Sequence, residues 1–218
     1  MNFQVNFNQP TILCEIMGRN KSDKGHLNIK ESWHNYTTFY YSIFKDVQLK
    51  KLRIFELGLG TNNINIPSNM GLHGRPGASL FGWREFFMNS DIFGADIDNS
   101  ILFECNKIKT YYCDQTNKHI IKYMWNVDEL KDNFDIIIED GLHEFNANVC
   151  FFENSIHKLN NNGYFIIEDI KTCDQHLFIE KINDWKNKYN NLIFQLINIP
   201  SNVNNIDNNL LVVHKNNI

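Results

Sequence analysis

The segment Arg53–Thr61, with the sequence RIFELGLGT, constrains the fold of this chain more than any other. Its apolar run leads to Glu56, and two glycines, Gly58 and Gly60, follow with one residue between them. A short apolar run of this kind is typical of a buried parallel strand. Glycine lets the backbone adopt positive φ and approach a ligand closely. The segment therefore predicts a buried strand ending in a tight turn, which would suit a nucleotide, a nicotinamide cofactor or a turn without a ligand.

Size and charge narrow the class of protein. The chain has 218 residues, of which 43% are hydrophobic, and this composition suits a single domain with one sizeable core. Its net charge of −4 argues against a nucleic-acid-binding protein, which normally carries a basic face. The five cysteines are an odd number without paired spacing, as expected for reduced thiols in the cytosol. With neither a signal-peptide pattern nor an apolar segment of ~20 residues, we expect a soluble cytoplasmic protein.

Strand and helix patterns alternate along most of the chain. This alternation predicts an α/β fold: a doubly wound, mostly parallel, seven-stranded sheet of the Rossmann-like type, with helices on both faces and an antiparallel last strand. After the strand that begins at Arg53, the predicted strands are 91–98, 109–114, 134–140, 164–169, 192–197 and 210–214. The predicted helices are 78–87, 116–131, a helix that carries Val149 to Leu159 and ends at 160–163, and 178–189.

The first 50 residues and the segment after the glycine turn do not follow this alternation. Aromatic residues recur at helical spacing between Trp33 and Phe44, whereas residues 1–20 show no clear element. Residues 62–77 contain too many glycines and prolines for a helix and predict an irregular insertion. We expect residues 1–50 to form a helical segment that covers the active site. Its polar residues expected beside a binding cleft are Asp23, Lys24, His34 and Tyr36.

Acidic residues stand at the carboxyl ends of the predicted strands. Asp96, Asp114 and Asp140 each end a strand, and Glu168 with Asp169 ends another. In open α/β sheets, ligands bind in the crevice outside these ends. A carboxylate at Asp96 is well placed to accept hydrogen bonds from two ribose hydroxyls. The pattern therefore predicts a ligand cleft with acidic groups along its edge.

Asp140, His143, Glu168 and Asp169 form the sharpest chemical pattern in the sequence. Neighbouring parallel strands would bring three carboxylates and one imidazole to the same edge of the cleft. Charged groups converge in this way when they hold a cation or share a proton. Carboxylate oxygens with few nitrogens suit Mg²⁺, whereas the lack of a cysteine in the group disfavours zinc. The alternative is a structural role, in which Glu168 and Asp169 cap a strand end or pair with Lys171.

These pieces resemble class I S-adenosylmethionine-dependent methyltransferases. Within that class the chain is similar to the macrocin and mycinamicin sugar O-methyltransferases and to methyltransferases of polysaccharide biosynthesis. Short motifs in a common order and spacing carry the resemblance between residues 55 and 169. The motifs are Phe55–Gly60, Gly77–Leu80 with Trp83, Gly94–Ile97, Asp140–His143 and Ile167–Asp169.

The resemblance implies one methyltransferase domain over residues 1–218, with S-adenosylmethionine as methyl donor and Mg²⁺ as metal. It implies that Asp140, Glu168 and Asp169 bind Mg²⁺, and that His143 is the catalytic base beside a catalytic Asp140. A hydroxyl coordinated to Mg²⁺ and facing this base would attack the sulfonium methyl group. The implied donor-binding residues are Glu56, Gly58 and Gly60 at the methionine part, Asp96 at the ribose, Asp114 and Gln115 at the adenine, and also Ser79 and Asp140. The implied substrate-side residues are Lys24, His34 and Tyr36.

The resemblance further implies a sugar hydroxyl as the methyl acceptor. The antibiotic enzymes of this group carry an additional N-terminal region, so we do not expect macrolide specificity here. We expect a small-molecule or nucleotide-linked sugar in the biosynthesis of a surface polysaccharide such as capsule or lipopolysaccharide. Assembly into a homo-oligomer is compatible with this expectation, whereas nucleic-acid and membrane-spanning partners are not expected.

Three other classes are weighed against this hypothesis. A nicotinamide-dependent oxidoreductase would use Gly58, Gly60 and Asp96, but it wants a third glycine where Asn62 and Asn63 stand. A metal-dependent hydroxylase on the same fold would hold iron in the acidic cluster. A catalytically inactive binding subunit would not need the whole set of acids and His143.

Overall fold

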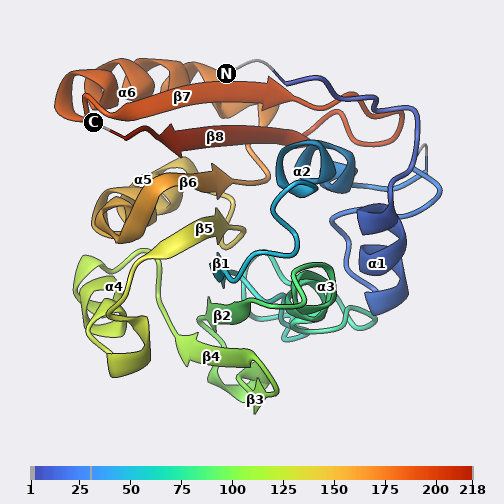
Figure 1. Ribbon diagram of the computed structural model, residues 1–218, viewed down its shortest axis with the longest axis horizontal. Coiled ribbons are helices and arrows are strands. Elements are labelled where there is room, and N and C mark those ends of the chain that lie inside the picture. The colour runs from blue at the N-terminus through green and yellow to red at the C-terminus, as the bar shows by residue number, and fades with distance from the viewer. Residues whose placement is uncertain (1–2, 30, 218) are drawn as a thin grey trace.

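An eight-stranded sheet forms the central layer of the computed structural model, which describes residues 3–29 and 31–217 (Figure 1). The strand order is β3-β4-β2-β1-β5-β6-β8-β7. Strand β5, with the sequence FDIIIE, is almost entirely buried, as expected for a parallel strand covered on both faces. The strands are β1 (Arg53–Leu57), β2 (Asp91–Asp96), β3 (Glu104–Cys105), β4 (Ile108–Tyr112), β5 (Phe134–Glu139), β6 (Leu159–Ile167), β7 (Leu192–Asn198) and β8 (Asn209–Lys215).

The strands β4, β2, β1, β5 and β6 are neighbours and run parallel. At one edge of the sheet β8 lies antiparallel between β6 and β7, and at the other edge β3 pairs antiparallel with β4. The predicted doubly wound, mostly parallel sheet is therefore confirmed, including its antiparallel last strand. The predicted count of seven strands omitted β3, because two residues are too few to show a strand periodicity.

Helices cover both faces of the sheet: α1, α2 and α3 lie on one face, and α4, α5 and α6 on the other (Figure 1). Adjacent residues of β1 point to opposite faces, so Ile54 packs in the core below α1–α3 and Phe55 in the core below α4–α6. Within the described residues, none of the helices combines the length and apolar character that crossing a membrane requires. The helices are α1 (Ile12–Asn20), α2 (Tyr36–Phe44), α3 (Ala78–Phe86), α4 (Lys118–Trp125), α5 (Phe145–Ser155) and α6 (Gln175–Lys188). The 3₁₀-helices of the described part are η1 (Asn99–Ile101), η2 (Asp128–Leu130), η3 (Ile156–Lys158) and η4 (Thr172–Asp174).

Helix α1 lies within the segment expected to be helical, but the sequence analysis found no clear element in residues 1–20. Its N-cap is Thr11, whose hydroxyl accepts a hydrogen bond from the Cys14 backbone N–H at 3.4 Å. The Cys14 thiol in turn accepts the Thr11 backbone N–H at 3.3 Å. This is a capping box in which cysteine stands where glutamate or glutamine is usual. Because cysteine is not a common residue at this position of a cap, the start of the helix has no clear signal in the sequence.

Two predicted helices are shorter than the sequence pattern suggested. The helix expected over 116–131 ends at Trp125, and Leu130 belongs to the separate 3₁₀-helix η2. The helix expected to extend to Leu159 ends at Ser155. Leu130 and Leu159 lie beyond these helix ends but are still buried. The hydrophobic pattern in the sequence therefore extends past the end of each helix.

Strand β6 begins earlier than predicted. Leu159 and Tyr164 both pair with β5, and residues 160–163 between them bulge out of the ladder. Asn162 has φ of 62°, a left-handed conformation that asparagine tolerates better than most residues. The polar residues expected to stop a helix therefore form a β-bulge within a strand.

The sheet changes its direction of winding between β1 and β5. The chain passes from β1 to β2 and β4 on one side, and from β5 to β6 on the other. The crevice at the carboxyl ends of such strands is where doubly wound sheets bind ligands. Residues 62–77 contain neither helix nor strand, as predicted. They turn back to the crevice, where the Gly77 N–H donates to the Leu59 carbonyl at 2.7 Å just before α3 begins.

The backbone is packed closely around Gly58 at this crevice. Gly58 has φ of 89°, and a Cβ on it would lie 1.8 Å from the carbonyl oxygen of Asp140. Because the obstacle is backbone, no side-chain rotation relieves the clash. We predict that Gly58→Ala lowers the free energy of unfolding by ~3 kcal/mol or more, as left-handed strain and overpacking add together. Urea denaturation followed by circular dichroism would measure this loss.

Gly71→Ala is the matched control. Gly71 also has positive φ, at 67°, but a Cβ there would meet no atom within 4 Å. This variant should lose only ~1–2 kcal/mol. Equal losses in the two variants would contradict the view that backbone contact with Asp140 requires glycine at position 58.

Candidate functional site

A cavity of about 920 Å³, measured with its open mouth, lies at the carboxyl ends of β1, β2, β4 and β5. Most of the predicted site residues line it, together with Asp23 and part of the 62–77 insertion. Glu56, Glu168, Lys24, His34 and Tyr36 are not among its lining residues. The predicted site residues that line the cavity are Gly58, Gly60, Ser79, Asp96, Asp114, Gln115, Asp140, His143 and Asp169.

Glu56 is fully buried behind the cavity. Its carboxylate accepts hydrogen bonds from the Ser79 hydroxyl and the Trp83 indole N–H, both on α3. Burial raises the pKa of Glu56, although the nearby Lys24 ammonium opposes that change. Glu56 therefore anchors the first turns of α3, and Ser79 is the member of this group that faces the cavity.

Asp96 holds the loop that follows the first strand. Its Oδ2 accepts the Leu59 N–H at 2.7 Å, and its Oδ1 accepts the Asp98 N–H at 2.8 Å. Asp98, which sequence reasoning did not single out, accepts hydrogen bonds from the hydroxyls of Thr61 and Ser100. A carboxylate has about four lone-pair positions, so Asp96 can still accept hydrogen bonds from a ligand in the cavity.

Gln115 is held by a buried glutamate that the sequence analysis did not assign to the site. Its Nε2 donates to Glu139 Oε1 at 2.9 Å, and its Oε1 accepts the Leu142 N–H at 2.8 Å. Burial raises the pKa of Glu139 to about 7. Glu139 directly precedes the Asp140–His143 motif, but its side chain lies on the other face of the strand end and leaves no separate sequence signal. Asp114, at the cavity wall next to Gln115, accepts hydrogen bonds from the N–H and hydroxyl of Thr116.

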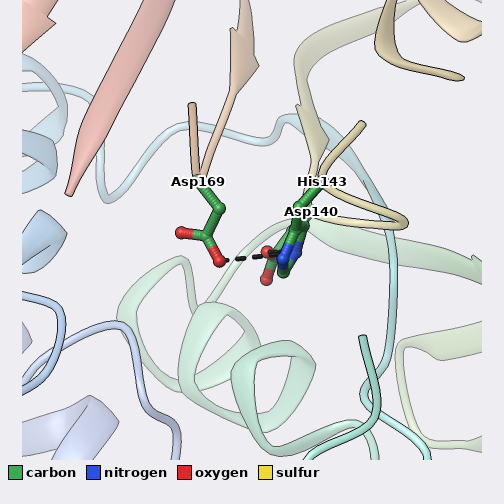
Figure 2. A group of neighbouring side chains, drawn as sticks. All are labelled: Asp140, His143 and Asp169. Atoms are coloured by element: carbon green, nitrogen blue, oxygen red, sulfur yellow. Dashed lines mark hydrogen bonds and ion pairs between the residues drawn. The ribbon is translucent and has the colours of Figure 1, made fainter. Parts of the chain in front are cut away.

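Asp140, His143 and Asp169 meet at one side of the cavity (Figure 2). His143 Nε2 lies 3.1 Å from Asp140 Oδ1 and 3.3 Å from Asp169 Oδ2. Burial opposes a charge on His143, but Asp169 and Asp140 outweigh it and raise the pKa of the imidazole to about 10. His143 and Asp169 have φ of 57° and 53°, a left-handed conformation that is uncommon for residues other than glycine and concentrates at functional sites.

Glu168 does not join this group. One ligand atom from each of Asp140, His143 and Asp169 lies within 4.8 Å of the others, and this is the group in the described residues with the spacing for a metal ion. The Glu168 carboxylate instead accepts hydrogen bonds from the Lys24 ammonium and the Tyr40 hydroxyl. Tyr40 is a further residue that sequence reasoning missed, because an aromatic residue at helical spacing is indistinguishable from core.

Lys24 reaches the acids from the loop between α1 and α2. Its side chain is only 2% exposed, and its Nζ lies 2.6 Å from Asp140 Oδ2 and 3.8 Å from Glu56 Oε1, in addition to its contact with Glu168. Burial lowers the pKa of a lysine, but here Asp140 and Glu168 outweigh burial and raise the pKa of Lys24 well above its usual value. One buried ammonium therefore faces the ends of three adjacent strands, β1, β5 and β6.

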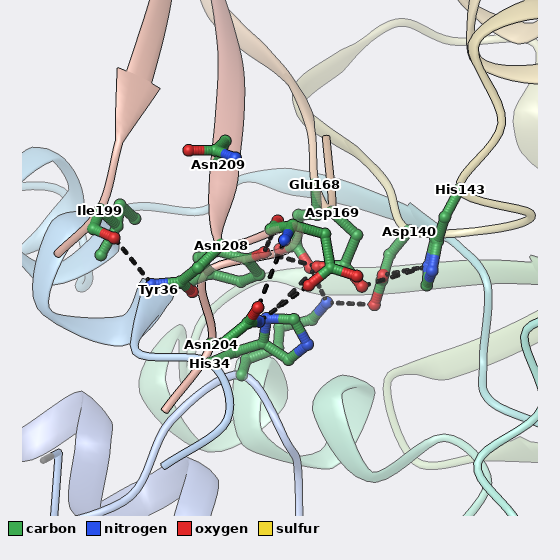
Figure 3. A network of polar contacts seen from close by, with 12 residues as sticks. His34, Tyr36, Asp140, His143, Glu168, Asp169, Ile199, Asn204, Asn208 and Asn209 are labelled. Carbon is green, nitrogen blue, oxygen red and sulfur yellow. Dashed lines mark hydrogen bonds and ion pairs between the residues drawn. The ribbon is translucent and has the colours of Figure 1, made fainter. Parts of the chain in front are cut away.

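His34 and Tyr36 contact Asp169 from the N-terminal segment (Figure 3). The Tyr36 hydroxyl donates to Asp169 Oδ1, and His34 Nδ1 lies 3.4 Å from the same oxygen. Asn208, just before β8, donates to Asn35 Oδ1 at 2.8 Å and so joins this segment to the start of β8. The three predicted substrate-side residues, which were expected beside a binding cleft, are therefore buried against the acids.

The chain is similar in sequence to curated sugar O-methyltransferases, although no family model matches it. It is 28% identical over 165 residues to 8-demethyl-8-(2-methoxy-alpha-L-rhamnosyl)-tetracenomycin-C 3'-O-methyltransferase of Streptomyces olivaceus, over 76% of this chain and 38% of the relative. It is 31% identical over 140 residues to L-olivosyl-oleandolide 3-O-methyltransferase of Streptomyces antibioticus, over 64% of this chain and 33% of the relative. The matched region spans roughly a third of the length of these relatives.

A solved structure has the same fold. MycE methyltransferase from the mycinamycin biosynthetic pathway, in complex with Mg and SAH, matches with a TM-score of 0.71 at 22% sequence identity, over 95% of this chain and 55% of MycE. This match confirms the predicted Rossmann-like fold, and the curated relatives confirm the resemblance predicted from the motifs. The chain thus has the class I methyltransferase fold and is similar in sequence to the sugar O-methyltransferases of macrolide and tetracenomycin pathways.

Proposed function

We propose that this chain transfers the methyl group of S-adenosylmethionine to a sugar hydroxyl with the help of Mg²⁺. The observation that carries the proposal is the joining of two sites in one cavity: a glycine turn with Asp96 at one side, and Asp140, His143 and Asp169 at the other. The similarity to sugar O-methyltransferases supports the reaction class, and MycE, described with Mg and SAH, supports the two cofactors.

The donor half of the cavity fits S-adenosylmethionine by its chemistry. Asp96 would accept hydrogen bonds from the ribose hydroxyls, as acids at the end of the second strand do in related folds. Asp114 and Gln115 would face the adenine, with Glu139 holding the Gln115 amide in place. The methionine part would lie against Gly58, Gly60 and Ser79, and Glu56 would act from behind by holding Ser79.

The acidic half fits a hard cation at Asp140 and Asp169, whose oxygens face the same space. When bound, Mg²⁺ would stabilise the developing alkoxide of the acceptor. Without a metal, Asp140 and Asp169 keep His143 in its protonated form, and a cation held by the same two carboxylates would offset their charge and lower the pKa of the imidazole. The neutral His143 would then take the hydroxyl proton as the acceptor oxygen forms its bond to the methyl carbon and the carbon–sulfur bond breaks. A one-histidine, two-carboxylate group differs from the two-histidine, one-carboxylate set of iron oxygenases, and this difference favours the methyltransferase over the hydroxylase.

Residues 1–50 would cover the acceptor side of a single domain comprising residues 1–218. Lys24, His34 and Tyr36 would then position the acids rather than contact the acceptor, since all three are buried against them. The acceptor would be a small-molecule or nucleotide-linked sugar that serves the biosynthesis of a surface polysaccharide. A screen of nucleotide-linked sugars and glycosides with labelled donor would identify it.

Donor identity is the first test. S-Adenosylhomocysteine should bind in calorimetry without added metal, and NAD and NADP should bind more weakly or not at all. Asp96→Asn should weaken binding of the product by ~10-fold or more, because it removes charge-assisted hydrogen bonds. The exposed Asp132→Asn is the control and should bind like wild type. Tighter binding of a nicotinamide cofactor would overturn the methyltransferase proposal.

Metal dependence is the second test. Turnover should fall by ~10-fold or more in chelator and return with Mg²⁺, because the developing alkoxide would lose its counter-charge. Asp169→Asn should reduce turnover at fixed Mg²⁺ in the same way, whereas the exposed Asp184→Asn on α6 should not. Full activity of the wild-type protein in chelator would show that the acids have a structural role.

The role of His143 is the third test. His143→Ala should lower kcat by ~10²-fold or more while leaving the affinity for S-adenosylhomocysteine near that of wild type, the pattern of a lost general base. The residual rate should rise with pH as solvent hydroxide replaces the base. The exposed His119→Ala on α4 serves as control. An unchanged kcat would assign the base to another group, with His34 as the next candidate.

A further inference from the structure

The oxygens of Glu168 and Asp140 are already engaged by donors from the protein itself. Lys24 contacts Glu168 Oε2 and Asp140 Oδ2, and the remaining oxygens of the two carboxylates contact the Tyr40 hydroxyl and His143 Nε2. The ammonium therefore lies between the two carboxylates that the sequence analysis assigned to one metal ion. A divalent cation shared by these carboxylates would have to approach a buried positive charge.

We propose that the Lys24 ammonium is a built-in counter-cation that competes with a divalent cation for the carboxylates of Asp140 and Glu168. This inference rests on the proposed function only in that the acids bind a divalent cation. It does not depend on the identity of the methyl donor. A bound metal would be held by Asp140 and Asp169 while Lys24 keeps Glu168, and Glu168 would become a ligand only when the ammonium moves away. Lys24 would thereby set the metal affinity of the site.

Three features of Lys24 support this role. Its side chain is 2% exposed, so water does not screen its charge. It also lies 3.8 Å from Glu56 Oε1, so its charge is shared among three carboxylates that would otherwise repel one another. Finally, it comes from the loop between α1 and α2, which does not belong to the sheet that carries the acids. The counter-charge can therefore move relative to the acids without breaking a strand pairing.

Lys24→Met tests the proposal, because methionine keeps an unbranched side chain of similar length and removes the charge. Calorimetric titration with Mg²⁺, and with Mn²⁺ followed by electron paramagnetic resonance, should show binding at least about tenfold tighter than in wild type. In chelator this variant should melt below wild type, because its acids lose their counter-charge. Added Mg²⁺ should then raise its melting temperature more than it raises that of wild type.

Lys21→Met is the matched control, since Lys21 lies in the same segment but is exposed. It should bind metal like wild type. Metal affinity in Lys24→Met that is equal to or weaker than that of wild type, or no metal binding by either protein, would overturn the proposal.

A double variant keeps the test decisive if Lys24→Met does not fold. Lys24→Met with Glu168→Gln removes one charge of each sign and leaves Asp140 and Asp169 in place. Because Lys24 already occupies Glu168 in the wild type, this protein should bind Mg²⁺ at least as tightly as wild type. Weaker binding would show that Glu168 is a ligand in the presence of Lys24 and would contradict the proposal.

Titration of the same proteins with S-adenosylhomocysteine tests donor binding separately. Failure of the methyltransferase proposal can therefore be distinguished from failure of the proposal for Lys24.

Discussion

The buried Lys24 ammonium holds Asp140 and Glu168 together at the ends of β5 and β6. A buried charge without a partner costs several kcal/mol, so closing over these strand ends with both acids ionised requires a cation from the covering segment. The docking of α1 and α2 on the sheet supplies that cation, and α2 adds two hydroxyl donors, Tyr40 to Glu168 and Tyr36 to the neighbouring Asp169. The position of the N-terminal segment is therefore fixed by electrostatics as much as by its aromatic packing.

The same requirement connects the two halves of the cavity. Glu56, on β1, lies within reach of Lys24 and also anchors α3 through Ser79 and Trp83. A change of charge on the acidic side would therefore alter the interactions of Glu56 with the first turns of α3, which border the donor side. Asp96 and Gln115 are held by separate hydrogen bonds to backbone N–H groups and to Glu139. The donor side thus has its own supports in addition to this connection.

The sequence predicted the architecture and much of the site, because parallel strands place their ends at a common edge. Asp140, His143 and Asp169 meet as this rule requires. The sequence could not predict that the Glu168 carboxylate contacts Lys24 and Tyr40. Consecutive residues at a strand end point in different directions, and both partners come from a distant segment. The left-handed backbone at His143 and Asp169 was also hidden, because aspartate and histidine tolerate it but only a small fraction of them adopt it. The unusual cap at Cys14 concealed α1 for a comparable reason.

The separation of these partners along the chain has a consequence for folding. Lys24 is 116 residues from Asp140 and 144 residues from Glu168, so their contacts are among the least local in the molecule. Contacts of this kind form late, because the intervening chain must first be ordered. During synthesis the segment that carries Lys24 leaves the ribosome before β5 and β6, so its ammonium cannot pair with Asp140 and Glu168 until those strands have been made. Completion of the acidic site therefore reports that the first and last thirds of the chain have assembled.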